Sequence, residues 1–248
     1  MLLLLGACAE PGSPMPELVP PAWRDGETSV YHVIKGDSVQ FRSTTVLRFD
    51  EEFGVPTTVV TTTVVPVESQ RYFLDSSMVV FHRDSLVPRR STQSLETDIA
   101  LFDIEARYEG KRVFIRKQSI DGVEERTLRL EPRSYDNEMV RTLLRTVPLV
   151  SGTSFRISSV APMDLRAVPV DVMVLGTKQV TCGLGDILCR EVVLITPAKE
   201  VRLWYEIEQP HRLVALLDQE SDTEVLLAAY SASTPDTLGT GIPGLPEP

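Results

Sequence analysis

The sequence predicts a mainly β protein, folded as a curved antiparallel sheet or half-open barrel with one covering α-helix near residues 136–147. Apolar and polar residues alternate with a period of two, as in half-buried strands, over most of the chain. Turn-forming residues separate these segments at short intervals, and strands do not alternate with helices as a parallel sheet would require. We therefore expect about ten or more strands in one antiparallel meander.

The prolines are concentrated at the two ends of the chain. The sequence has 248 residues and 18 prolines, of which five lie in residues 11–21 and four in 235–248. Neither end shows the apolar periodicity of a packed element, so both are expected to be extended and poorly packed. The predicted organisation is a signal and lipidation segment over 1–8, a proline-rich tether over 9–21, a single β-rich domain over 22–230 and a flexible tail over 231–248.

Composition and charge exclude several classes of protein. Hydrophobic residues make up 42% of the chain and charged residues 24%, which is ordinary for a globular domain. The formal net charge is −10, whereas phosphate backbones are bound by concentrated Lys and Arg surfaces, so nucleic acid is not expected as a partner. No apolar run approaches the roughly 18 to 20 residues that a membrane-spanning helix needs.

The N-terminus carries the most specific signal. A short run of leucines at 2–5 is followed by Gly6, Ala7 and Cys8, which resembles the Leu-Gly-Ala-Cys lipobox of bacterial lipoproteins. Cys8 is therefore the predicted lipidation site, because several acyl chains on one residue suffice for stable membrane anchoring. The segment departs from a full signal peptide, since no Lys or Arg precedes it and the apolar run is short. The alternative is a frayed apolar terminus.

The lipobox also indicates where the protein resides. A lipidated Cys8 makes the membrane a partner and predicts a protein of the bacterial cell envelope. The next residue is Ala9 rather than Asp, which in enterobacteria-like sorting directs a lipoprotein to the outer membrane, facing the periplasm. In a bacterium with one membrane, the same signal predicts the outer leaflet of the cytoplasmic membrane.

Strands are expected wherever the period-two alternation or β-branched residues dominate. Residues 57–65 are almost entirely Thr and Val, which suit a pleated sheet and lose side-chain freedom in helices. Glu109-Gly110 and Asp121-Gly122 are expected turns between strands. The remaining candidate strands are 39–49, 99–108, 111–120, 124–130, 155–160, 168–176, 188–196, 201–208, 212–219 and 224–230.

One segment is helical in its pattern. Met139, Val140, Leu143, Leu144 and Val147 form an apolar stripe of about three turns over 136–147. Asp136 or Asn137 can cap its start, and Pro148 stops its end. The helix is expected to cover one opening or face of the curved sheet; the alternative is a lid over a ligand cavity.

Two further cysteines, Cys182 and Cys189, flank a segment rich in turn formers. Gly183, Gly185 and Asp186 favour a hairpin loop, which would place the cysteines on its two arms. In an envelope compartment such a pair can form a disulfide, worth about 2–3 kcal/mol by loop closure. A metal or redox pair and two unpaired thiols are the alternatives.

Several segments resemble the bacterial envelope family called domain of unknown function 3108. The residues that carry the resemblance lie at 23–31, 85–88, 135–152, 172–177, 189–192 and 201–214, including the helix that ends in Arg145-Thr-Val-Pro148 and the closing hairpin with Trp204. The Cys182–Cys189 loop departs from the simpler hairpin of the family. The resemblance implies a curved antiparallel sheet with a helix, similar in outline to envelope lipoprotein carriers, and no activity.

No catalytic, cofactor-binding or metal site is predicted. His32, His82 and His211 show no spacing typical of metal ligands, and Gly183-Leu-Gly185 lacks the setting of a dinucleotide site. Acidic clusters such as 50–52 lack the regular oxygen spacing of a calcium loop. We therefore expect a protein without an enzymatic activity or a cofactor.

Three functions remain as hypotheses. The first is a non-enzymatic envelope lipoprotein that binds an apolar or amphipathic, lipid-like ligand in its concave sheet. The second is a structural or assembly lipoprotein that offers a sheet edge or face to an envelope protein partner, with the Thr/Val-rich segment 57–67 as the candidate edge. The third is an enzyme whose polar site is assembled from distant strands.

Overall fold

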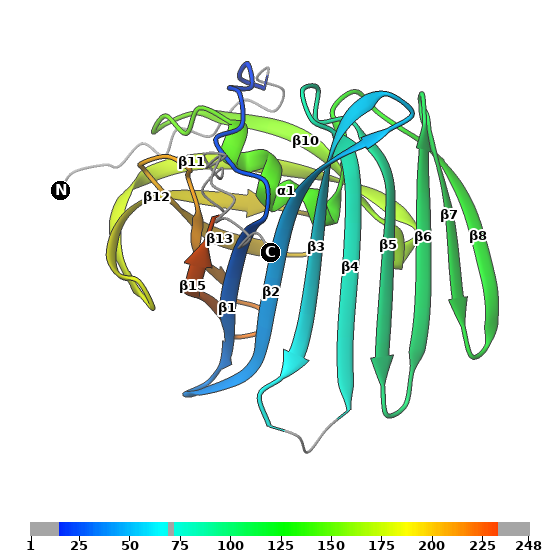
Figure 1. Ribbon diagram of the computed structural model, residues 1–248, viewed down its shortest axis with the longest axis horizontal. Helices are drawn as coiled ribbons and strands as arrows, with labels where there is room; N and C mark the ends of the chain where they lie inside the picture. The colour runs from blue at the N-terminus through cyan, green and yellow to red at the C-terminus, as the bar shows by residue number, and fades with distance from the viewer. Residues whose placement is uncertain (1–14, 69–71, 233–248) are drawn as a thin grey trace, which may run out of the picture.

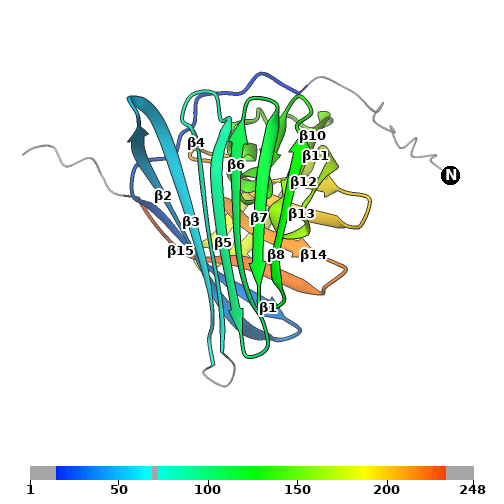
Figure 2. The same ribbon diagram turned by 90° about the vertical axis from the view of Figure 1, so that its right-hand side faces the viewer.

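The computed structural model describes residues 15–68 and 72–232 and contains one sheet of fifteen strands (Figures 1 and 2). The predicted mainly β class is confirmed. The strands are β1 (Glu27–Lys35), β2 (Ser38–Glu52), β3 (Val55–Pro66), β4 (Phe73–His82), β5 (Pro88–Thr97), β6 (Leu101–Glu109), β7 (Arg112–Ser119), β8 (Gly122–Arg129), β9 (Ser134–Asp136), β10 (Ser154–Ala161), β11 (Arg166–Cys182), β12 (Gly185–Ile195), β13 (Glu200–Glu206), β14 (Leu213–Asp218) and β15 (Thr223–Ser231).

The sheet is almost entirely a meander, and the first and last strands of the chain pair with each other in its interior. Strands β1 to β8 follow one another outward in one direction, strands β15 to β9 follow one another in the other, and β1 pairs with β15. Every pairing is antiparallel except the short parallel pairing of β9 with β10. The expected antiparallel meander is therefore confirmed, and the edges of the sheet are β8 and β9.

The sheet curls far enough for the edge formed by β9 and β10 to pack against the inner face of β5, β6 and β7 (Figure 2). Val160 of β10 packs with Ile104 and Ala106 of β6 and with Val113 and Ile115 of β7. Ser91 of β5 and Tyr108 of β6 donate hydrogen bonds to Asp136 at the end of β9. Side chains therefore close the curve where no backbone ladder does, as the predicted half-open barrel requires.

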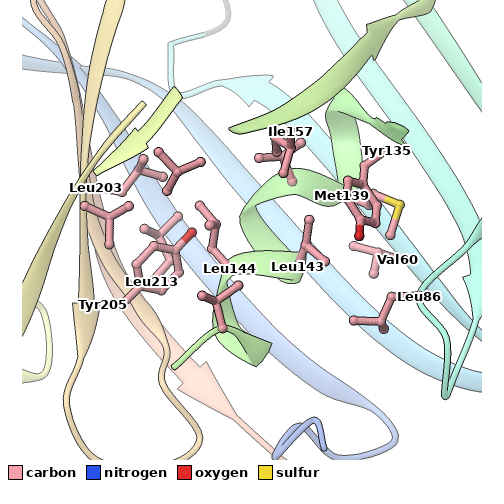
Figure 3. Packing of buried hydrophobic residues seen from close by; sticks show 14 of the residues in the cluster. Val60, Leu86, Tyr135, Met139, Leu143, Leu144, Ile157, Leu203, Tyr205 and Leu213 are labelled. Atoms are coloured by element: carbon pink, nitrogen blue, oxygen red, sulfur yellow. The ribbon is translucent and has the colours of Figure 1, made fainter. Parts of the chain in front are cut away.

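The helix lies inside the curve of the sheet. It comprises α1 (Asn137–Leu143) and a 3₁₀ turn, η1 (Leu144–Thr146). Met139, Leu143 and Leu144 are almost completely buried, between Val60 and Leu86 on one side and Leu203, Tyr205 and Leu213 on the other (Figure 3). The helix predicted over 136–147 is confirmed. It fills the inside of the curve, because its apolar residues face both halves of the sheet.

A buried ion pair holds the C-terminal end of this helix. Arg145 donates to both carboxylate oxygens of Glu27 on β1, at 2.6 and 3.2 Å, and also donates to the carbonyl of Pro210. Its guanidinium lies 5.5 Å from the ring centre of Trp23. Both charges are therefore paired and hydrogen-bonded inside the domain, which is the arrangement that buried charges require.

Strands β4 and β5 and the three-residue β9 went unrecognised in the sequence, and β1 was covered only by the family resemblance at 23–31. One predicted edge is also wrong. In β4 three consecutive residues, Val79, Val80 and Phe81, are buried, and in β5 the buried residues include Ser91. Neither strand therefore shows a clean alternation of apolar and polar residues. The segment 57–67 is not an edge, because β3 pairs with β2 on one side and with β4 on the other.

The described part of the predicted tether packs on the domain. Met15 and Leu18 are half-buried against the main apolar core, and the amide of Val19 donates to the carbonyl of Thr146 at 2.7 Å. The expectation of a poorly packed segment is therefore wrong for residues 15–19. Cys8, the rest of the tether and the tail from residue 233 lie outside the described residues.

The hairpin of β11 and β12 bends back over the outer face of the sheet. Its register shifts between Val174 and Thr177, and beyond this bulge Cys182 and Cys189 contribute to an apolar cluster with Trp204 and Val214. The amide of Gly183 at the tip donates to the carbonyl of Leu227 on β15. A further small apolar cluster, separate from the main core, therefore lies on the convex side of β13–β15.

The two cysteines are free thiols in this structure. Cys182 pairs with Gly185 and Cys189 with Lys178, because the turn is only two residues long and β12 begins at once. The cysteines lie on the two arms of the hairpin as predicted, but they are not opposite each other, and the register does not support the predicted disulfide. Burial is the main cause that raises the pKa of Cys189 to about 12, and Glu206 adds to it.

Gly183→Ala should destabilise the domain. A Cβ atom at this position would lie 2.7 Å from the Cα atom of Ala228 and closer still to its carbonyl oxygen, so the hairpin tip must move. We expect a loss of about 1–3 kcal/mol, or a Tm lower by about 3–10 °C, in thermal unfolding followed by circular dichroism. Gly176→Ala is the control, because its Cβ meets nothing within 4 Å. An equal Tm for both variants would contradict the close approach of Gly183 to the backbone of Ala228.

Arg145→Met should lower the stability of the domain far more than the same substitution in an exposed ion pair. Arg145 and Glu27 have exposed side-chain fractions of 10% and 3%, whereas Arg156 and Asp171, also 2.6 Å apart, have 45% and 41%. Leaving Glu27 buried without its partner should lower the free energy of unfolding by about 3–5 kcal/mol in urea titrations. Arg156→Met should change it by less than about 1 kcal/mol. A similar loss of unfolding free energy in both variants would show that the burial of the Arg145–Glu27 pair does not determine its contribution to stability.

Candidate functional site

A cavity of about 890 Å³ opens to solvent at the rim of the curved sheet. Three segments form it: the β4–β5 turn, the β6–β7 turn and the crossover 129–135 that leads from β8 to β9. The amide of Leu130 donates to the carbonyl of Lys111 at 2.9 Å, which joins two of these segments. The volume lies within the roughly 300–1,000 Å³ of small-molecule sites.

Apolar and aromatic side chains form one part of the cavity lining. Tyr108 and Tyr135 line it, and Tyr135 also belongs to the main apolar core. The other apolar lining residues are Val87, Pro88, Leu130 and Pro132. Val87 is 52% exposed although it is a large apolar residue. The lining therefore offers an apolar surface to a ligand that enters from solvent.

The charged residues of the lining are mostly basic. The acidic ones are Glu52, Glu109 and Glu131. Glu52 is bound by Arg89 and Arg90, which lowers the pKa of its carboxyl, and Glu109 is bound by Arg107. The basic lining residues are Arg89, Arg90, Arg107, Lys111, Arg129 and Arg133. Within the described residues, the last three form no ion pair.

A buried carboxylate lies behind the cavity wall. Asp136 is completely buried, and its Oδ2 accepts hydrogen bonds from the hydroxyls of Ser91 and Tyr108, both at 2.6 Å. Its Oδ1 accepts the amide of Glu138 at 3.0 Å, so Asp136 is the N-cap of α1. Burial raises the pKa of Asp136 to about 6, and the hydrogen bonds from Ser91 and Tyr108 oppose this shift.

The chemistry of this cluster indicates a structural role. The hydroxyl of Ser91 donates a hydrogen bond to the carboxylate of Asp136, and both side chains are buried. A serine nucleophile needs its base beside an accessible substrate, and this pair does not face solvent. Tyr108 uses its hydroxyl in the same way, and burial, helped by the negative charge of Asp136, raises its pKa. The three side chains therefore fix β5, β6 and the helix relative to one another behind the cavity.

Within the described residues, the space between the helix and the concave face is small. Between α1 and strands β1–β3 there is a cavity of about 40 Å³, with Tyr31, Glu138 and Arg141 among its lining residues. This space holds a water molecule or two. We expected a ligand in the concave sheet with the helix as a possible lid, but the helix fills that position, and the cavity of about 890 Å³ lies at the rim.

The histidines do not converge. His32 lies on β1, His82 at the end of β4 and His211 before β14. Among residues 15–68 and 72–232, no group of three His, Cys, Asp or Glu side chains is placed to hold a metal ion. In the same part of the chain, no helix combines the length and apolar character needed to cross a bilayer.

Sequence reasoning did not find the rim cavity. The segment 85–88 contributed only to the family resemblance, and the sequence patterns did not single out Lys111, Arg129 or Arg133. One signal was present: Arg and Lys are frequent at the ends of strands and turns from 107 to 133 in a chain with net charge −10. The structure brings these residues to one rim.

The structure and the comparisons agree on the class of protein. An antiparallel sheet curled around a buried helix defines a barrel-like β domain. Residues 29–223 match the family described as "Protein of unknown function (DUF3108)". The chain belongs to this family, and the resemblance seen in the sequence is confirmed. No curated protein matches the sequence.

Solved structures share the fold at low sequence identity. A β-barrel-like protein of domain of unknown function DUF1849 from Brucella abortus has a TM-score of 0.56 at 10% identity, over 85% of this chain and 99% of that one. A "putative exported protein with YmcC-like fold" from Bacteroides fragilis has a TM-score of 0.36 at 7% identity, over 87% and 100%. A "putative lipoprotein" from Parabacteroides distasonis has 0.35 at 8%, over 86% and 99%. The first similarity shows the fold alone, and the other two are too weak to support an argument.

Asp136→Asn should change how stability depends on pH. Asp136 has a pKa of about 6 in the folded protein, against 3.8 as its ordinary value, so the unfolded chain ionises first. Its contribution to stability is therefore present below about pH 4, falls as the pH rises to about 6 and stays constant above. In urea titrations from pH 4 to 7, the stability of the variant relative to the wild type should rise by roughly 3 kcal/mol.

The matched control for this pH series is Asp171→Asn. Its hydrogen bonds to Arg156 hold the pKa of the Asp171 carboxyl below its ordinary value. Asp171 is therefore ionised in both the folded and the unfolded state above about pH 4, and the stability of this variant relative to the wild type should stay nearly constant from pH 4 to 7. A parallel pH dependence for both variants would contradict the raised pKa of Asp136.

Proposed function

We propose that this protein is a non-enzymatic cell-envelope lipoprotein that binds an amphipathic ligand in the rim cavity. The observation that carries the proposal is the composition of that cavity. It combines a volume of about 890 Å³ with a lining that contains both apolar and aromatic side chains and an excess of basic ones. A ligand with an apolar chain and a polar group matches both kinds of side chain.

The position of the tether supports a ligand that comes from the membrane. The hydroxyl of Tyr135, which lines the cavity, contacts the sulfur of Met15 at 3.8 Å. The chain from Cys8 to Met15 can span no more than about 25 Å even when fully extended. A domain anchored through Cys8 would therefore keep its cavity close to the surface of the lipid bilayer.

The envelope location rests on the sequence Leu-Gly-Ala-Cys at 5–8. A lipidated Cys8 would supply the anchor, and the residues that follow would serve as a short connection to the domain. Ala9 favours the outer membrane in a bacterium with two membranes. Labelled palmitate supplied to a bacterial host should enter the full-length protein but not its Cys8→Ser variant.

Native mass spectrometry of the lipoprotein, extracted from membranes in a mild detergent, tests ligand binding. We expect adducts of lipid size on the wild type and at least a threefold lower occupancy in Val87→Trp, because the indole occupies part of the cavity. Val123→Trp is the control, since Val123 is also half-exposed, at 51% against 52%, but does not line the cavity. A wild type without any adduct would contradict the proposal.

A further inference from the structure

We infer that the rim cavity binds an anionic group, a phosphate or a carboxylate, through Lys111, Arg129 and Arg133. This inference deepens the proposed function, on which it rests for the apolar part of the ligand. The shared chemistry is an anionic oxygen group, whether it belongs to a lipid headgroup or to a free anion. Its basis is an excess of unpaired positive charge at one place on an acidic protein.

The charge of the cavity is opposite to that of the chain. The chain carries a net charge of −10, yet basic residues outnumber acidic ones in the cavity lining, six to three. Glu52 and Glu109 are already paired with Arg89, Arg90 and Arg107. Three cations of the lining, Lys111, Arg129 and Arg133, therefore remain against one acidic lining residue, Glu131.

Backbone contacts hold these three cations on one rim. The hydrogen bond from Leu130 to the carbonyl of Lys111 places Arg129 beside the β6–β7 turn. Arg133 follows in the crossover, where its carbonyl accepts the amide of Ser158 at 3.0 Å. All three side chains are exposed, so they are available to a ligand. A fixed backbone with free guanidinium and ammonium groups is suited to binding oxyanions.

The backbone conformation of Arg133 determines where its side chain lies. Its φ is +63°, in the left-handed region that residues other than glycine rarely adopt. The surrounding turn is held by the hydroxyl of Ser134, which donates to the carbonyl of Glu131 at 2.7 Å. This turn conformation places the side chain of Arg133 at the cavity.

Isothermal titration calorimetry with three probes tests the inference. The protein is the full-length chain with Cys8→Ser, so that no attached acyl chain competes for the cavity. The probes are dodecyl phosphate and dodecyl maltoside, both below their micelle concentrations, and inorganic phosphate. We expect dodecyl phosphate to bind at least tenfold more tightly than either of the others, and more weakly as the salt concentration rises.

The variants separate a local site from the overall charge. Lys111→Gln/Arg129→Gln/Arg133→Gln should reduce the affinity for dodecyl phosphate at least tenfold and leave that for dodecyl maltoside unchanged. Lys35→Gln/Arg42→Gln/Arg48→Gln is the control, because it removes the same charge from exposed residues outside the cavity. Equal losses in both triple variants would overturn the inference. Circular dichroism confirms that each variant is folded.

The remaining outcomes distinguish this inference from the proposed function. Equal affinity for the two amphiphiles would overturn the anionic preference and leave amphiphile binding intact. Inorganic phosphate binding as tightly as dodecyl phosphate, and only with Lys111, Arg129 and Arg133 present, would support the anion site and overturn the amphipathic ligand. Binding of none of the three probes would overturn both.

Discussion

Asp136 and Arg145 lie at the two ends of the helical segment inside the curve of the sheet, and each is buried or nearly so. Asp136 caps the first turn and accepts hydroxyl hydrogen bonds from β5 and β6. Arg145 pairs with Glu27 on β1, close to the centre of the sheet. These polar contacts fix a short amphipathic helix between strands distant in the sequence, and the curvature of the whole sheet depends on that helix.

The helix also determines where a ligand can bind. Its apolar residues pack against both halves of the sheet and fill the concave centre, and among the described residues a space of about 40 Å³ lies beside β1–β3. The crossover from β8 to β9 has to pass over the rim before the chain enters the helix. The cavity therefore forms at that rim, where the crossover and two turns leave side chains that the core does not use.

Much of the fold follows from sequence patterns, and the candidate site does not. Most strands and the helix were predictable, because alternation and the 3.6-residue stripe reflect the burial of one face. Strands β4 and β5 were not, because their inward faces meet the polar start of the helix: Ser77 donates to Glu138 and Ser91 to Asp136. The basic residues at the rim come from two turns and a crossover, whose proximity no local pattern encodes.

The sequence alone determined the β class, the helix, the family resemblance and the expected lipidation of Cys8, because each depends on residues adjacent or periodic in the chain. The tertiary structure alone decided that β1 joins β15, that 57–67 lies inside the sheet, and that Cys182 and Cys189 do not face each other. It also decided that Lys111, Arg129 and Arg133 share one cavity. The physical reason is the same each time: strand order and turn length set which side chains meet, and both depend on how the sheet closes around its helix.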